Sequence, residues 1–169
     1  IAHQGMTENF RMNRLLMWIQ PENYSSGIGY QTVQGLYAIG SGGLFGKGLG
    51  KSLQKLGFIP ESQNDMIFSI ICEELGLFGA MCIILVFALM LWRIIHIAQN
   101  APDLFGTMLA AGVFAHVAVQ VVLNIAVVTN FIPNTGVSLP FISYGGTASF
   151  FLLLEMGIVL NISSKIRLE

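Results

Sequence analysis

Three long apolar stretches alternate with polar segments along the second half of the chain. The first, residues 66–92, follows the polar run 60–65, and its last 18 residues carry no charge. The second, residues 104–129, is an uncharged run of 26 residues, and the third, residues 147–164, contains one charged side chain, Glu155. About 20 apolar residues in a helix cross the hydrocarbon core of a bilayer. The pattern therefore predicts three membrane-spanning helices.

The segments between these stretches predict the topology. Basic residues concentrate in short cytoplasmic loops, and Arg93 and Lys165 directly follow the first and third stretches. The cytoplasmic segments are then the loop 93–103 and the tail 165–169, and the extracytoplasmic segments are residues 1–65 and 130–146. The glycine-rich first segment includes residues 31–45, which are mildly apolar and are expected to lie along the interface or to re-enter the membrane.

Composition agrees with a membrane protein. The chain is 54% hydrophobic and 10% charged, whereas soluble domains average about 25% charged. Its 8 basic and 9 acidic residues nearly balance, which gives no indication of a nucleic-acid partner. Cys72 and Cys82 are expected to be packing residues, because ten helical residues separate them by about 15 Å, too far for a disulfide. The chain opens without an initiator methionine and reads as a piece of a longer protein.

Asp65 ends the polar run before the first apolar stretch, so it is expected where water meets hydrocarbon. A carboxylate there could act as the base of an enzyme that uses a lipid-linked polar substrate. It could also simply cap the helix, and position alone favours the cap. Glu74 lies nine residues later, close to the same helical face, so the two could line one pocket. Of the neighbours Glu73 and Glu74, at least one should enter a cavity or pair with a base.

A glycine-rich stretch at residues 40–52 does not fit a phosphate-binding loop, because Phe45 stands where the Walker A pattern needs glycine. The stretch and its continuation carry Lys47, Lys51 and Lys55, spaced four apart. If helical, these lysines share one face, which could be a solvated surface or a cradle for an anionic headgroup or pyrophosphate.

The second apolar stretch carries a stripe of small and polar residues at every fourth position: Gly112, His116, Gln120 and Asn124. The stripe should face the interior of a helical bundle, either for interhelical hydrogen bonds or as a wall for substrate. In the third stretch Glu155 needs a partner or must be protonated. The uncharged loop between them ends in residues 139–146, which combine proline, aromatic residues and a glycine pair and predict a turn that folds back into the bundle.

Several strings together resemble one family, the SEDS proteins of bacteria, which comprise FtsW, RodA and SpoVE. The strings are Gly29-Tyr30-Gln31, residues 38–50, Pro60-Glu61 before Asp65, Glu73-Glu74-Leu75-Gly76, Asn124-Ile125 and residues 140–146. They appear in order over essentially the whole chain, and residues 48–55 look more like the FtsW and SpoVE branch than the RodA branch.

The resemblance implies an all-α polytopic membrane protein of about ten spans, of which this chain is the C-terminal part, with a large extracytoplasmic loop. It implies an inverting peptidoglycan glycosyltransferase of the bacterial cytoplasmic membrane that polymerises lipid II in cell division, cell-shape control or spore formation. The family's essential aspartate falls at Asp65, with Gln63-Asn64 where relatives often have His-Thr. The substrate-binding residues are expected to be Gln31, Lys47, Lys51, Lys55, Glu61 and Glu74.

The implied partners are lipid II, a class B penicillin-binding transpeptidase and other division or elongation proteins. No resident metal site is expected, although a divalent cation such as magnesium or manganese could assist the departing pyrophosphate. Two other functions stay open: a lipid II flippase, which the polar stripe would serve, and a non-catalytic scaffold that docks a partner helix on Gly76 and Gly79.

Overall fold

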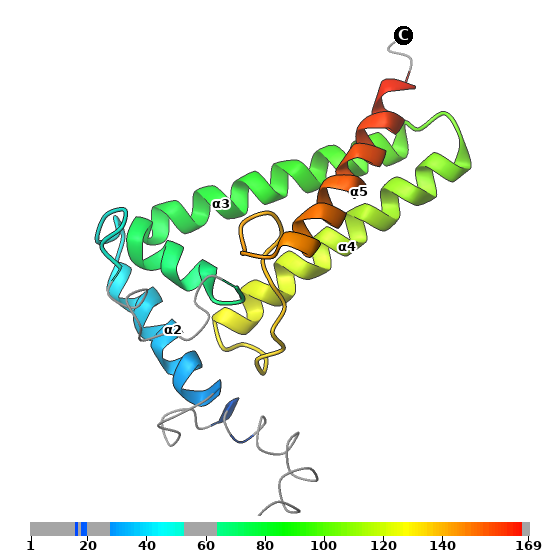
Figure 1. The fold of residues 1–169 in the computed structure, drawn as a ribbon. Helices are drawn as coiled ribbons and strands as arrows, with labels where there is room; N and C mark the ends of the chain where they lie inside the picture. Colours follow the sequence, from blue (N-terminus) through cyan, green and yellow to red (C-terminus); the bar gives the residue numbers. More distant parts are fainter. Residues whose placement is uncertain (1–15, 17, 20–27, 53–63, 167–169) are drawn as a thin grey trace, which may run out of the picture.

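The computed structural model describes residues 16, 18–19, 28–52 and 64–166. In this part of the chain the elements are α2 (Ile28–Gly42), α3 (Ile67–Gln99), α4 (Leu104–Val128) and α5 (Gly146–Ser164) (Figure 1). The last three are long and apolar enough to cross a membrane, judged by length and composition. The predicted all-helical membrane fold is thus confirmed.

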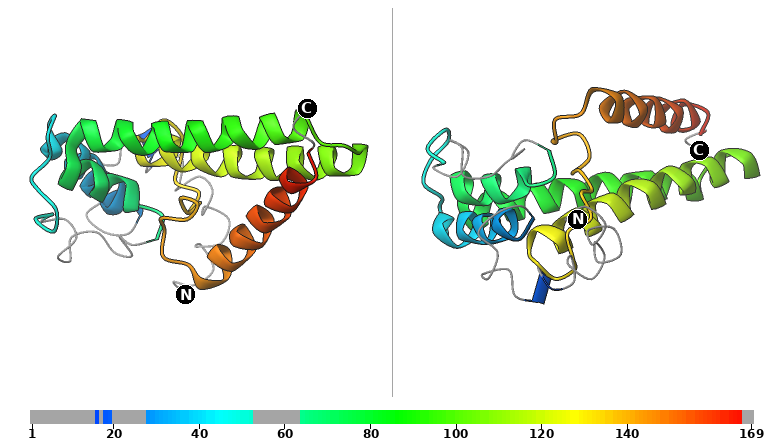
Figure 2. Two further views of the ribbon diagram at one scale, coloured as in Figure 1. Left: turned by 90° about the horizontal axis from the view of Figure 1, so that it is seen from above. Right: turned by 60° about the horizontal axis from the view of Figure 1, so that its bottom comes forward.

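The helices α3 and α4 lie antiparallel along most of their length, and α5 crosses them obliquely (Figures 1 and 2). Their shared core is apolar; it includes Phe87, Ile94, Val113, Val117 and Val159. Because lipid is as apolar as these side chains, close packing rather than hydrophobic burial supplies the attraction between the helices.

The helix α3 continues to Gln99, so Arg93 and His96 lie on its last turns rather than in the loop expected at residues 93–103. No glycine or proline lies between Gly79 and Pro102, and the residue preceding a proline disfavours the helical conformation. The following helix, α4, has Asp103 as its N-cap, whose carboxylate accepts a hydrogen bond from the backbone N–H of Gly106 at 3.0 Å. That bond satisfies one of the free N–H groups at the helix start.

A sharp break divides α3 at Gly76, which the apolar pattern did not predict. Gly76 has φ 68° and ψ −167°, a conformation that only glycine adopts readily. The two halves of α3 point in different directions (Figure 1). A broken helix leaves backbone groups without their normal partners, and here a neighbouring loop supplies them.

The partner is the loop that follows α2. Its N–H groups donate to the carbonyls at the end of the first half of α3: Lys47 to Glu73 at 2.9 Å and Gly48 to Glu74 at 3.0 Å. In return, its carbonyls accept from the start of the second half: Gly43 from Leu77 at 2.9 Å and Leu44 from Phe78 at 3.2 Å. We call these four bonds the loop–helix exchange.

The described part of the lysine-bearing segment, residues 43–52, is therefore not helical. The residues after Gly42 form turns, with positive φ at glycines such as Gly46, so Lys47 and Lys51 do not share a helical face as their spacing had suggested. Before them, α2 takes up most of the mildly apolar residues 31–45. It packs closely against α3, because a Cβ at Gly35 would lie 3.3 Å from Ser69 Oγ.

Candidate functional site

Asp65 lies in the turn that leads into α3. The N-cap of α3 is the next residue, Met66, which makes no side-chain cap. Asp65 therefore does not occupy the N-cap position that the sequence had suggested for it. Its carboxylate is half-buried and accepts a hydrogen bond from the side-chain amide of Gln31 on α2, with Nε2 and Oδ1 3.1 Å apart. The sequence-predicted residues Gln31 and Asp65 are thus in direct contact.

Asn124 fixes the backbone of the same turn. Its side chain is completely buried on α4, and Nδ2 donates to the backbone carbonyl of Asp65 at 2.9 Å and to that of Val137 at 2.7 Å. One side chain therefore ties together α4, the Asp65 turn and the loop before α5. The sequence indicated an inward-facing Asn124 but not its partners, which lie 59 and 13 positions away.

A cavity of about 460 Å³ opens at this end of the molecule, beside the start of α3. It is lined by Ile67, two residues after Asp65, and by the glycine-rich turn that leads into α5: Ile142, Ser143, Tyr144, Gly145, Gly146 and Ser149. Residues Leu139 and Pro140 at the start of that turn are buried, as expected for a segment that folds back into the bundle.

A second polar cluster surrounds Glu73, whose side chain is fully buried. The ammonium of Lys47 lies 2.6 Å from Oε1, and the Ser52 hydroxyl donates to Oε2. Ser41 Oγ lies 3.5 Å from Oε1. The expectation that one of the two adjacent glutamates pairs with a base is confirmed, and the pair holds the glycine-rich loop against the break in α3.

The remaining predicted substrate-binding residues are Lys51, Glu74, Lys55 and Glu61. Lys51 is exposed on the loop, and Glu74 is half-buried, with an Oε1 atom that is buried and has no hydrogen-bond partner among the described residues. Lys55 and Glu61 lie outside the described residues. Binding of substrate by these side chains stays a prediction.

The stripe on α4 bonds to neighbouring segments. His116 Nδ1 lies 2.9 Å from the carboxylate of Glu155 on α5, and His116 Nε2 lies 3.1 Å from the side-chain amide of Gln120. Glu155 thus has the partner that its position required. Together with Asn124, these contacts support the interhelical interpretation of the stripe over a substrate wall.

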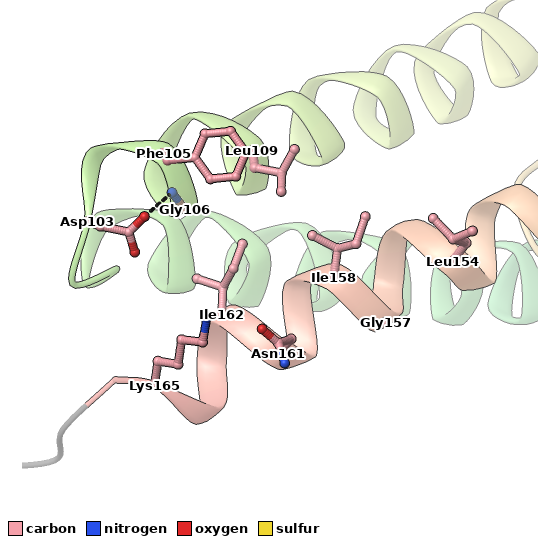
Figure 3. Close-up of a pocket in the computed structure, with 10 residues that line it drawn as sticks. All are labelled: Asp103, Phe105, Gly106, Leu109, Leu154, Gly157, Ile158, Asn161, Ile162 and Lys165. Atoms are coloured by element: carbon pink, nitrogen blue, oxygen red, sulfur yellow. Dashed lines mark hydrogen bonds between the residues drawn. The ribbon is translucent and has the colours of Figure 1, made fainter.

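The other end of α4 holds a separate cavity of about 460 Å³ (Figure 3). Its walls come from the start of α4 and the end of α5 and are mostly apolar, with Asp103, Asn161 and Lys165 as the polar members. Twenty helical residues separate Leu104 from Asn124, or about 30 Å at ~1.5 Å per residue. This cavity is therefore distant from Asp65.

Replacing Lys47 with methionine is expected to lower stability, because the buried Glu73 carboxylate would lose its countercharge. We expect about 1–3 kcal/mol, less than the ~3–5 kcal/mol typical of a fully buried pair, because the Lys47 side chain is 32% exposed. Thermal unfolding of a full-length protein in detergent measures the effect. Lys51→Met is the matched control, since Lys51 forms no ion pair with the described residues, and equal melting temperatures for the two variants would contradict the prediction.

Three helices that are long and apolar enough to cross a membrane define an integral membrane protein, and a half-buried carboxylate lies just before the first of them. Residues 1–168 of the 169 match the family described as "Cell cycle protein", that of FtsW, RodA and SpoVE. The chain therefore belongs to this family, the SEDS proteins, which confirms the resemblance read from its motifs.

Relatives come from several bacteria. The chain is 48% identical over 154 residues to Stage V sporulation protein E of Bacillus subtilis, covering 91% of this chain and 42% of the relative. It is 44% identical over 159 residues to a protein of Trichlorobacter lovleyi named "Probable peptidoglycan glycosyltransferase FtsW", covering 94% and 42%. The B. subtilis protein of the same name is 43% identical over 157 residues, covering 93% and 39%. The chain thus spans about two fifths of the length of these relatives.

Two solved structures share the fold. A chain from a structure titled "Structural coordination of polymerization and crosslinking by a peptidoglycan synthase complex" superposes with a TM-score of 0.74 at 23% identity, covering 99% of this chain and 46% of that one. The crystal structure of a point mutant of the Thermus thermophilus rod shape determining protein RodA gives a TM-score of 0.60 at 23% identity, with 100% and 60% covered. The helices described above therefore match part of the helical bundle in each of these two structures.

Proposed function

We propose that a full-length protein carrying this chain is a peptidoglycan glycosyltransferase that polymerises lipid II, with Asp65 as its general base. The observation that carries the proposal is the half-buried Asp65, which lies at the entrance to a membrane-spanning helix; its carboxylate accepts a hydrogen bond from Gln31, and its backbone carbonyl accepts one from Asn124. Relatives at 44% and 43% identity bear the name of this activity.

The chemistry needs one base. As the hydroxyl oxygen of the acceptor sugar bonds to the anomeric carbon of the lipid-linked donor, Asp65 accepts the hydroxyl proton. The bond from that carbon to the pyrophosphate oxygen breaks on the opposite face, and its electron pair leaves with the lipid pyrophosphate. The configuration at the anomeric carbon is inverted, and the only products are the longer glycan and the lipid pyrophosphate.

The leaving group carries negative charge, which a nearby cation would stabilise. Lys51 is the exposed candidate on the described part of the glycine-rich loop, whereas Lys47 is already paired with Glu73. Within the described residues, no three His, Cys, Asp or Glu side chains come together as a metal site.

The site belongs on the outer face of the bacterial cytoplasmic membrane, because the basic residues Arg93 and Lys165 mark the other ends of their spans as cytoplasmic. The proposed partner there is a class B penicillin-binding transpeptidase. The structural similarity to a chain of a peptidoglycan synthase complex supports that partnership.

The two alternatives use features that already have other roles in the structure. A flippase would use the polar stripe of α4, yet His116 and Asn124 bond to Glu155 and to the Asp65 turn. A scaffold would offer Gly76 and Gly79 to a partner helix. However, a Cβ at Gly76 would meet the loop backbone at 2.3 Å, and one at Gly79 would meet Leu75 at 2.1 Å, so both glycines are covered within the chain.

The test is a polymerisation assay on a purified full-length protein in detergent or liposomes, with lipid II as the only substrate. We expect glycan strands, resolved by gel electrophoresis, without any sugar nucleotide. Movement of lipid II across liposomes without strands would favour a flippase. Strands formed only after a separate polymerase is added would leave the scaffold as the function.

A further inference from the structure

Among the described residues that contact Asp65, Asn124 on α4 and Gln31 on α2 act on different parts of it. Asn124 binds the backbone carbonyl, and Gln31 binds the carboxylate. With the backbone fixed by a completely buried residue, the direction of the carboxylate depends on the two side-chain torsions of Asp65. The hydrogen bond from Gln31 to the carboxylate acts on those torsions.

Gln31 is itself held firmly. It lies in the first turn of α2 after Ile28, and α2 packs onto the first half of α3 at the close contact of Gly35 with Ser69. Ala38, further along α2, is fully buried. Gly35 lies about one helical turn from Gln31, and Ser69 lies about one turn from Asp65. The amide is therefore presented to Asp65 by a packed helix and not by a loop.

We propose that Gln31 is a positioning residue for Asp65, acting through the carboxylate rather than on substrate. This inference rests on the function proposed above. A donor on Oδ1 at 3.1 Å limits rotation of the carboxylate, and so sets the direction of its second oxygen, Oδ2. A base must lie within hydrogen-bond reach of the proton that it removes, so the loss of this bond lowers the rate of the chemical step more than it weakens binding of lipid II.

The variant Gln31→Met keeps the size of the side chain and removes the donor. In a full-length protein polymerising lipid II, we expect kcat to fall about tenfold to hundredfold, the range for loss of a hydrogen bond to a charged group, while KM changes little. The matched control is Gln34→Met. Gln34 lies one turn further along α2, and its side chain makes no hydrogen bond with the described residues, so its kcat should match the wild type. A rise in KM at unchanged kcat, or an unchanged kcat, would overturn the proposal.

A double-mutant cycle separates positioning from an independent role. In an Asp65→Asn background, measured by single-turnover kinetics at high enzyme concentration, Gln31→Met should change the residual rate by no more than about twofold. The same fold loss in both backgrounds would show that Gln31 acts independently of Asp65, and the proposal would fall while the general base stands. Full activity of Asp65→Asn alone would instead remove the general base, and with it any carboxylate for Gln31 to position.

Discussion

Asp65→Asn in a full-length protein is expected to reduce lipid II polymerisation by ~10²–10⁴-fold, the usual contribution of a general base. Asparagine has nearly the same shape as aspartate, and its side-chain oxygen can still accept a hydrogen bond from Gln31. The Asn124 bond is to the backbone of residue 65 and is not affected. The substitution therefore removes basicity while leaving the surrounding contacts in place, and the glycan product measures the loss.

The same substitution at Asp103 provides the control. Asp103 caps α4 at the end remote from Asp65, and asparagine caps a helix about as well as aspartate. Asp103→Asn should polymerise lipid II at the wild-type rate. If Asp65→Asn did so too, Asp65 would be no more than a residue of the turn before α3.

Gly76→Ala is expected to have the largest effect on folding. A Cβ at this position would lie 2.3 Å from the backbone nitrogen of Gly46 and 2.6 Å from the carbonyl oxygen of Leu44. The backbone conformation alone costs a residue other than glycine about 1–3 kcal/mol, and displacement of the loop adds the loss of its hydrogen bonds with α3. We expect more than ~3 kcal/mol in total, seen as a lower melting temperature and a lower yield of folded protein.

Gly112→Ala is the matched control, because a Cβ at Gly112 would meet nothing within 4 Å and alanine favours the helical conformation. Its melting temperature should equal or exceed that of the wild type. If Gly76→Ala and Gly112→Ala had the same melting temperature, the break in α3 would not depend on glycine.

The apolar pattern located the spans well, because a long uncharged run has few other conformations in a membrane. The helix α4 begins at Leu104 and α5 ends at Ser164, the residues at which the second apolar stretch begins and the third ends. The pattern could not show the break at Gly76, because an isolated glycine is tolerated in many helices. The prediction also ended the first helix at Trp92, before the first basic residue, whereas α3 continues to Gln99.

The candidate site was predicted in part. The need of Glu155 and of the Glu73–Glu74 pair for partners followed from the cost of unpaired charges in a membrane. The identity of those partners, His116 and Lys47, did not, because they lie 39 and 26 positions away. The contacts of Asp65 are likewise set by packing between helices, which spacing along the chain does not encode.

The loop–helix exchange limits how the sequence and the length of the loop from Gly43 to Gly48 can change. Its four bonds join main-chain atoms, so they place few demands on side chains, and Leu44, Phe45 and Leu49 are exposed. They do depend on register, since the residues from Gly43 to Gly48 must reach both sides of Gly76. Added or deleted residues would shift every bond at once. The segment should therefore accept changes of side chain, apart from its crowded glycines, more readily than changes of length.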